Sequence, residues 1–437
     1  MLQVLYLVHD LSDPAVRRRV VMLQAGGAVV TLVGFRRSGE PVSDVASISP
    51  IDLGKTSDGR FAQRLAAIAQ ATLTLGTALK RVAKPDVIIG RNLEMLALAN
   101  RARAIFSGGV PASDRRELKG GADEVPIVYE CLDVHRLLLR RDLAGKAIRS
   151  AERALARNAA LLITSSPAFI RQYFEPFGQL DLPVELVENK VLELLPCPPA
   201  CGEGRSAKRS GVGVVNVEHN RHHPHPPATR APSPQGGRKA PGEPWKIGWF
   251  GALRCRRSLA LLAEFSRRME GRVEVVLRGR PAYTEFDDFD GFVAAEPYLQ
   301  FHGAYRNPED LARIYGEVHF SWAIDFFEAG QNSDWLLPNR LYEGCRYHCV
   351  PIAMQGTETS LFLKARGIGF ALSKPDAGEL VSLFERLDAE QYEREQAKIA
   401  AQDARTWICD EGDCRALVGR LRQLVPMRQN AVVEAMA

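Results

Sequence analysis

A group of arginines follows a predicted strand in the second half of the chain. The strand, residues 246–250, is followed by Gly251, and then by Arg254, Arg256 and Arg257 just before a predicted helix. Glycine lets a ligand approach the backbone closely, and a planar guanidinium group can bind two phosphate oxygens at once. Backbone N–H groups at the start of a helix also attract anions. The segment is therefore predicted to bind a phosphate-containing ligand, the alternative being a solvated basic loop.

Carboxylates and imidazoles follow two predicted strands in the first half of the chain. They are His9, Asp10 and Asp13 after residues 4–8, and Glu130, Asp133 and His135 after residues 127–129. Such a group can accept a proton from a reacting hydroxyl, an effect worth roughly 10²- to 10⁴-fold in rate. Asp13 and Asp133 are the preferred candidates. Asp13 also precedes Pro14 at a predicted helix start, where capping alone would account for it, and Asp133 can equally hold a turn.

The composition excludes several classes of protein. With 437 residues, 46% of them hydrophobic and 25% charged, the chain is expected to form two or three globular domains. Its 57 basic and 52 acidic residues leave a net charge of +5, too little for a dedicated nucleic-acid binder. Because the sequence shows neither a run of 18 apolar residues nor a signal peptide, we expect a cytoplasmic protein that does not span a membrane. The eight cysteines include no C-x-x-C pair and are interpreted as reduced thiols.

Short β-branched runs alternate with helical patterns in two parts of the chain. In the first part we expect strands at 4–8, 29–33, 87–89, 127–129 and 161–164, and helices at 14–23, 93–106 and 136–157. In the second part we expect strands at 246–250, 273–277, 299–302, 318–324 and 350–354, and helices at 258–269, 308–315 and 339–346, with Asn307 capping the helix that begins at Pro308. This alternation predicts two doubly wound α/β domains with parallel sheets. The polar insertions at 39–59 and 107–125 are expected to be surface loops.

A proline-rich segment separates the two parts. Residues 196–244 contain ten prolines and no hydrophobic period, so this stretch is predicted to be a disordered linker. The domains are then residues 1–195 and 245–405, followed by a helical tail at 406–437. Cys197, Cys201 and four histidines of the linker have a spacing that fits no standard zinc module, so no metal site is expected. Its arginines lack the aromatic residues of a nucleic-acid binder.

Three motifs of the second part resemble a known family. They are W-F-G-A-L-R-C-R-R-S-L-A-L-L (249–262), F-H-G-A-Y-R-N-P-E-D-L-A-R-I-Y (301–315) and N-R-L-Y-E-G-C-R-Y-H-C-V-P-I-A (339–353). In this order they are similar to elements of the family-4-like GT-B glycosyltransferases of bacterial exopolysaccharide and lipopolysaccharide assembly. Residues 12–37, 128–135 and 186–191 also match the general pattern of these enzymes. The first strand runs into V-H-D-L-S-D-P, without the G-x-G-x-x-G of a dinucleotide site, which argues against a dehydrogenase.

The resemblance implies a GT-B fold, in which two Rossmann-like domains face a cleft, the first binding the acceptor and the second a nucleotide-sugar donor, expected here to be a UDP-sugar. It implies these donor-binding residues: Gly251, Arg254 and Arg257 at the diphosphate, Tyr305 at the base, Glu343 at the ribose hydroxyls, and Asn339 and Arg340 at the phosphates or the donor sugar. The acceptor is expected to be a glycan that is linked to a lipid. His9, Asp13, Asp133 and His135 would then supply a base for an inverting reaction. No metal cofactor is expected, because arginines and a helix N-terminus can neutralise the diphosphate.

One position departs from the family pattern. The E-x7-E motif that ends at Glu343 would place its first acid at position 335, which is Trp335. Asp334 or Glu328 can substitute for that acid, and the sequence leaves a retaining and an inverting mechanism both open. Two other functions also stay open: a UDP-sugar 2-epimerase of the same fold, and a non-catalytic assembly or membrane-scaffolding protein.

The predicted helix at 136–157 carries seven basic residues against two acidic ones. Arg149, Arg153 and Arg157 are spaced to share one helix face. Such a face suits contact with an anionic membrane surface, which would place the protein on the inner face of the plasma membrane. A solvated face is the alternative interpretation.

Overall fold

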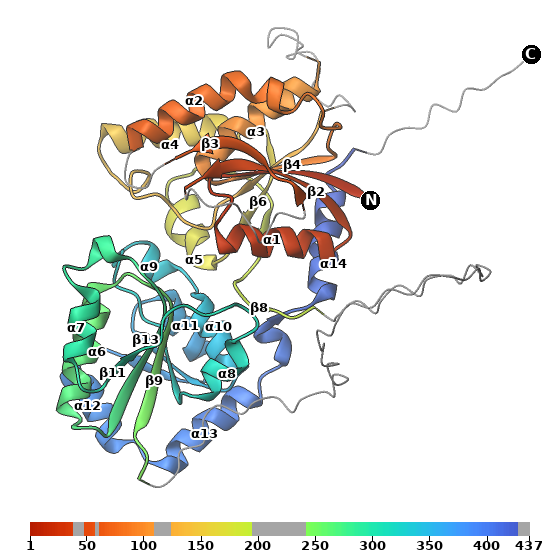
Figure 1. The fold of residues 1–437 in the computed structure, drawn as a ribbon. Coiled ribbons are helices and arrows are strands. Elements are labelled where there is room, and N and C mark those ends of the chain that lie inside the picture. The colour runs from red at the N-terminus through yellow and green to blue at the C-terminus, as the bar shows by residue number, and fades with distance from the viewer. Residues whose placement is uncertain (38–47, 57–60, 109–123, 195–241, 427–437) are drawn as a thin grey trace, which may run out of the picture.

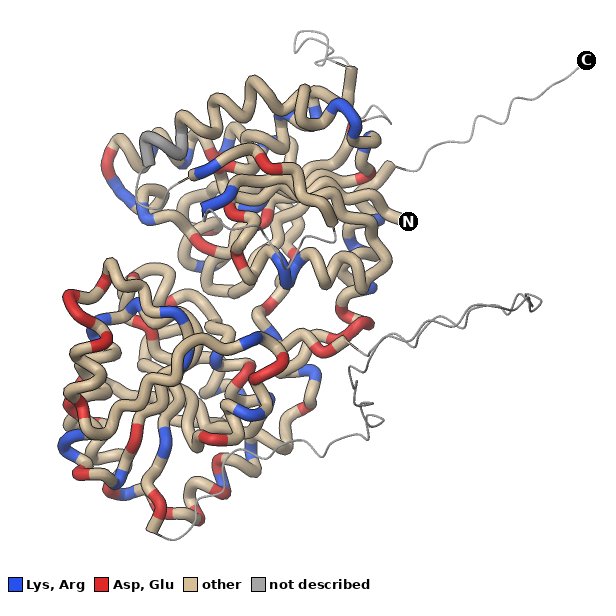
Figure 2. Tube along the Cα trace, in the orientation of Figure 1, with Lys and Arg blue, Asp and Glu red and all other residues tan. Residues whose placement is uncertain are grey.

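The computed structural model describes residues 1–37, 48–56, 61–108, 124–194 and 242–426. These residues form two α/β domains, each built on one parallel sheet (Figure 1). Lysine and arginine are interspersed with aspartate and glutamate over both domains, as the small net charge leads one to expect (Figure 2). The predicted linker lies outside the described residues except for its last three positions.

The first domain contains a seven-stranded sheet in the order β3-β2-β1-β4-β5-β6-β7. Its strands are β1 (Leu2–Val8), β2 (Ala28–Arg36), β3 (Ile51–Lys55), β4 (Val87–Arg91), β5 (Ile127–Glu130), β6 (Ala159–Thr164) and β7 (Val184–Leu186). Its helices are α1 (Pro14–Ala25), α2 (Phe61–Ala78), α3 (Asn92–Phe106), α4 (Leu143–Ala156) and α5 (Pro167–Phe169). Every side chain of β4 and β5 is buried, because helices cover both faces of the sheet.

The second domain contains a six-stranded sheet in the order β11-β10-β9-β12-β13-β14. Its strands are β9 (Trp245–Leu253), β10 (Val273–Pro281), β11 (Leu299–Phe301), β12 (Phe320–Trp322), β13 (Val350–Met354) and β14 (Phe370–Leu372). Its helices are α6 (Arg256–Arg268), α7 (Phe289–Ala295), α8 (Leu311–Gly316), α9 (Asn332–Trp335), α10 (Asn339–Arg346), α11 (Glu358–Arg366), α12 (Ala377–Arg386) and α13 (Ala389–Ala400). In both sheets the carboxyl ends of neighbouring parallel strands meet at one edge, where ligands of such folds bind.

The C-terminal segment returns to the first domain (Figure 1). Strand β15 (Ile408–Cys409) pairs with β8 (Val191–Leu192), and helix α14 (Glu411–Arg422) packs against α1. The contact is close at Gly26, because a Cβ atom there would lie 2.3 Å from the carbonyl oxygen of Cys414. The tail predicted from residue 406 onward therefore completes the hydrophobic core of the first domain with Cys414, Leu417, Val418 and Leu421.

Most predicted strands and helices are present, and three predictions are wrong in detail. The helix expected from Arg136 begins only at Leu143, because Asp142 caps it by accepting a hydrogen bond of 3.0 Å from Gly145 N. The helix expected from Pro308 begins at Leu311, and Asn307 does not cap it. The stretch 39–59, expected to be a loop, contains the edge strand β3.

Candidate active site

A polar cluster lies at the carboxyl ends of β1 and β4, which are neighbours in the first sheet. His9 Nε2 lies 3.9 Å from Asp13 Oδ2, and His9 Nδ1 lies 3.3 Å from the side-chain nitrogen of Asn92. Arg91 Nη2 lies 3.4 Å from the same Asp13 oxygen. The other oxygen of Asp13 accepts a hydrogen bond of 2.8 Å from Ala15 N and caps α1. Asp13 therefore has the capping role that its position before Pro14 predicted, and it also pairs with Arg91.

Glu130 supports this cluster from the buried end of β5. Its side chain is fully buried and accepts a hydrogen bond of 2.6 Å from Arg19 Nε and another from the Tyr6 hydroxyl, while Arg91 Nη1 lies 3.6 Å away. Burial opposes ionisation, but Arg19 and Arg91 hold the pKa of Glu130 below its ordinary value. Glu130 is therefore a structural counter-ion that fixes Arg91, and it is too enclosed to act as a base.

Asp133 lies in the loop after β5, where groups of both domains gather around it. Its side chain reaches solvent, but the surrounding protein removes much of its water, and this desolvation raises its pKa to about 6. Arg254 and Arg91 act in the opposite direction and favour the carboxylate, whereas Glu328 and Asp13 raise the pKa further. The next residue, Val134, exchanges two backbone hydrogen bonds with the side chain of Asn332 in the second domain, so the loop of the preferred base is docked against that domain. His135 is exposed, and its Nδ1 accepts a hydrogen bond of 3.2 Å from Leu137 N.

The predicted phosphate-binding segment follows β9 in the second domain. Gly251 has a φ of 110°, and Gly279 comes so close that a Cβ atom there would lie 1.8 Å from the Gly251 carbonyl oxygen. Arg254 forms an ion pair of 3.2 Å with Asp325, and its guanidinium group lies 4.7 Å from the centre of the Phe327 ring.

The two neighbouring arginines differ in their direction. The guanidinium group of Arg257 lies 4.8 Å from the centre of the Phe326 ring, in the same loop after β12 that holds Arg254. Arg256 instead pairs at 2.6 Å with Asp287, an exposed residue of another loop. Arg254 and Arg257 therefore both pack against the loop after β12, whereas Arg256 points to a different loop.

Glu343 of α10 is enclosed by the protein. Its two oxygens accept hydrogen bonds of 2.8 Å from the Asn307 side chain and 2.9 Å from the Tyr315 hydroxyl. Burial raises the pKa of Glu343, and both hydrogen bonds partly offset this effect. Tyr305 packs its ring edge-on against Phe250, with 6.4 Å between the ring centres. Whether Glu343 and Tyr305 bind the nucleoside stays a prediction.

Asn339 and Arg340 stand at the start of α10. Asn339 is exposed, whereas Arg340 is half-buried and donates a hydrogen bond of 2.9 Å from Nη2 to the carbonyl oxygen of Ile324. Its Nε is buried and has no hydrogen-bond partner within the described residues. An anionic ligand at this edge of the sheet would supply one.

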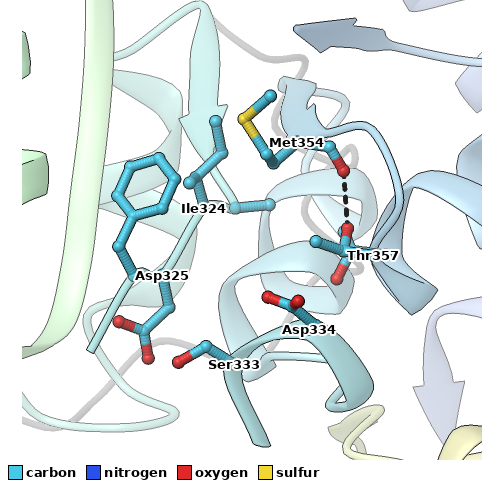
Figure 3. A pocket seen from close by; sticks show the side chains of 9 residues that line it. Ile324, Asp325, Ser333, Asp334, Met354 and Thr357 are labelled. Atoms are coloured by element: carbon cyan, nitrogen blue, oxygen red, sulfur yellow. Dashed lines mark hydrogen bonds between the residues drawn. The ribbon is translucent and has the colours of Figure 1, made fainter. Parts of the chain in front are cut away.

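A small pocket opens beside these residues, at the carboxyl ends of β12 and β13 (Figure 3). Its polar lining includes Asp325, Ser333, Asp334 and Thr357. Asp334 accepts a hydrogen bond of 3.0 Å from Gly330 N, and burial raises its pKa. The carboxylate next to position 335 therefore borders a pocket, which keeps it available as a substitute for the missing acid.

Trp335 itself joins the two domains. Its ring meets Phe169 of α5 edge-on, with 6.4 Å between the ring centres, and its carbonyl oxygen accepts a hydrogen bond from the Ser166 hydroxyl. Where the family pattern expects an acid, this chain has a domain contact. Sequence reasoning did not find this contact, nor the roles of Arg91 and Asn332; the only local signal was a charged residue at the end of the otherwise apolar strand β4.

The predicted exposure of a basic face on α4 is wrong for Arg149. Arg149 is buried, and its Nη1 donates hydrogen bonds of 2.5 and 2.6 Å to the carbonyl oxygens of Leu138 and Arg140. Its guanidinium group also lies 4.4 Å from the centre of the Phe177 ring. Because residues 136–142 fold back over the helix, this arginine holds the turn in place instead of facing solvent. Arg153 and Arg157 are exposed.

A curated protein of nearly the same length is similar to the whole chain. The chain is 54% identical over 438 residues to the succinoglycan biosynthesis protein ExoL of Rhizobium meliloti (strain 1021), covering 100% of this chain and 98% of the relative. The chain belongs to the ExoL family. No model in the protein-family scan matches it.

Solved structures show the fold of this ExoL-family chain. The Anabaena protein Alr3699/HepE, in complex with UDP and glucose, matches 97% of the chain with a TM-score of 0.60 at 12% identity and is covered completely. WaaG, a glycosyltransferase involved in lipopolysaccharide biosynthesis, matches 95% of the chain with a TM-score of 0.54 at 10% identity and is covered to 99%. The GT-B fold that the resemblance predicted is confirmed. None of the helices that the structure describes is long and apolar enough to cross a membrane.

Proposed function

We propose that this protein is a glycosyltransferase of exopolysaccharide assembly, which moves a sugar from a nucleotide donor, a UDP-sugar, onto a glycan acceptor. The observation that carries this proposal is the contact between the loop of Asp133 in the first domain and residues 325–332 of the second, the segment that also pairs with Arg254. The 54% identity to a succinoglycan biosynthesis protein and the UDP bound in the structurally similar HepE support it.

The chemistry follows from charge. An acceptor hydroxyl oxygen bonds to the anomeric carbon while the bond from that carbon to the diphosphate breaks, so negative charge grows on the leaving group. Arg254 and Arg257 face the edge of the sheet where that charge would lie. In an inverting reaction Asp133, as a carboxylate, takes the hydroxyl proton. In a retaining reaction the leaving phosphate accepts the hydroxyl proton instead, and Asp133 does not act as the base.

Calorimetry with UDP tests the donor site. We expect Arg254→Ala and Glu343→Ala each to weaken binding about tenfold or more, because a hydrogen bond to a charged group contributes on the order of 1.5 to 3 kcal/mol. Arg256→Ala is a matched control, since this neighbouring arginine pairs with Asp287 at an exposed site. Unchanged affinity in both test variants would remove the proposed site.

Product analysis separates the remaining functions. Incubation of wild type with the UDP-sugar alone would yield a new UDP-sugar if the protein were a 2-epimerase. A failure of UDP and other nucleotide diphosphates to raise the melting temperature would favour the non-catalytic assembly protein, because a ligand of the native state must stabilise it. If the protein is a glycosyltransferase, a transfer product forms only when both the donor and the acceptor are present. We propose that it requires no metal cofactor, and full activity in excess EDTA is expected.

The acceptor is proposed to be lipid-linked, with the protein bound at the cytoplasmic face of an anionic membrane. The turn before α4 and the first residues of this helix support the membrane contact. Leu143 is 82% exposed there and lies in the chain between the exposed residues Arg141 and Lys146. Basic side chains around an apolar one suit an anionic lipid surface. We expect Arg141→Glu with Lys146→Glu to reduce sedimentation with phosphatidylglycerol vesicles, and salt to have the same effect. Equal sedimentation of both proteins would refute this contact.

A further inference from the structure

Asn332 makes a double hydrogen bond across the two domains. It begins α9 in the second domain and is 4% exposed. Its Oδ1 accepts a hydrogen bond of 3.0 Å from Val134 N, and its Nδ2 donates one of 2.9 Å to the carbonyl oxygen of Val134. The same Nδ2 donates to Glu328 at 2.7 Å. The polar groups of the Asn332 side chain are therefore satisfied, and two of the three bonds join segments 198 residues apart.

An amide side chain fits this arrangement without a change of protonation. The N–H and C=O of Val134 need an acceptor and a donor side by side, and Asn and Gln are the side chains that carry both in one plane. Leaving a buried backbone group without its partner is unfavourable, so the two bonds also resist separation of the domains. The contact thus fixes the position of Val134 as well as its distance from α9.

The position of Asn332 links two parts of the proposed active site. On one side, Val134 directly follows Asp133 in the loop after β5. On the other side, Asn332 and Asp325 belong to one short segment after β12, and Asp325 holds Arg254 by an ion pair of 3.2 Å. Residues 325–332 therefore connect the two parts, because Asp325 pairs with Arg254 and Asn332 binds the residue next to Asp133.

We propose that Asn332 is a positioning residue, which fixes the position of Asp133 relative to Arg254 and so sets the rate of sugar transfer. The proposal rests on the proposed function and adds a residue to it. Within the described residues, the side chain of Asn332 is hydrogen-bonded to Val134 and to Glu328, a candidate for the missing acid, and not to the residues proposed to bind the diphosphate or the nucleoside. Its loss therefore affects catalysis after the donor has bound.

Two variants of Asn332 test this role. Asn332→Leu keeps the approximate size of the side chain but can neither donate nor accept, and Asn332→Ala removes the side chain beyond Cβ, so each variant loses all three bonds. We expect both to lower kcat at saturating UDP-sugar by about 10- to 100-fold, because small misplacements of catalytic groups have effects of this size. The dissociation constant for UDP should stay within about twofold of wild type. Asn189→Ala, which removes a domain contact of 3.1 Å to the Leu337 carbonyl oxygen, is the control and should keep wild-type kcat.

The results separate the positioning role of Asn332 from its domain contact and from the proposed function. Wild-type kcat in both variants, or an equal loss of kcat and of UDP affinity, would overturn the positioning role. Small-angle scattering tests the domain contact without any reaction. Asn332→Ala should increase the radius of gyration, and an unchanged radius would show that Asn332 does not hold the two domains together. If wild type transfers no sugar but Asn332→Ala still increases the radius of gyration, the proposed function and the positioning role both fail, and only the domain contact of Asn332 is supported.

Discussion

The ionisation of Asp133 should control how the rate depends on pH. With a pKa of about 6, this carboxyl group is about 90% ionised at pH 7 and about 10% ionised at pH 5. If the carboxylate accepts the acceptor proton, kcat at saturating substrates should therefore fall about tenfold between these two values. With the ordinary value of 3.8, the same change of pH would lower the rate by less than about a tenth. The size of the acidic fall thus reports the environment of Asp133.

Two substitutions should move this fall in opposite directions. Arg254→Gln removes the cation that lowers the pKa of Asp133, so the fall should begin at a higher pH; Glu328→Gln removes an anion that raises it, so the fall should begin at a lower pH. The amide introduced by Glu328→Gln can still accept the hydrogen bond from Asn332, which preserves the domain contact. The assay measures UDP release at saturating donor, from pH 5 to pH 8. A rate that is constant from pH 7 to pH 5, or a shift of both variants in one direction, would refute the reasoning.

Two further predictions concern stability. Because the folded pKa of Asp133, about 6, lies above its ordinary value of 3.8, folding binds extra protons between these values, and stability falls as the pH rises through this window. Asp133→Asn should therefore melt at a higher temperature than wild type at pH 7, and this difference should vanish below about pH 4 in calorimetric scans. Glu130→Gln leaves the buried Arg19 without its counter-ion and Arg91 with Asp13 alone, and it should lower the free energy of unfolding by about 3 to 5 kcal/mol. Urea titration measures that loss, and a loss below about 1 kcal/mol would mean that the cluster is hydrated in solution.

The sequence by itself determined the architecture of the two domains. Continuous apolar runs such as V-L-Y-L-V at the first strand, alternating with helical patterns, are typical of a parallel sheet covered on both faces, and this local pattern does not depend on distant residues. The same is true of Asp13 before Pro14, whose capping role is local. Motif order then led to the GT-B fold. These inferences hold because each uses residues that are close together in the chain.

Local patterns misled where distant groups compete for a side chain. Arg149 has the spacing of a solvated helix face, yet the carbonyl oxygens of the preceding turn and the Phe177 ring bury it. Asn307 has the type of a helix cap, yet its side chain donates to Glu343 instead. In each case the long-range partner decides the role of the residue, and the sequence around it carries no sign of that partner.

Only the tertiary structure decided which loops meet. Glu130 and Asp133 are acidic residues at the end of β5 and just after it. Glu130 is buried against Arg19 and Arg91, whereas Asp133 lies in the loop that is hydrogen-bonded to Asn332. The order of the strands sets which loop ends are neighbours, and the docking of the two domains adds Arg254 and Asn332 to them. Docking depends on side-chain surfaces that come together only after both domains have folded. For that physical reason the sequence could supply candidates for the site, while their selection required the complete fold.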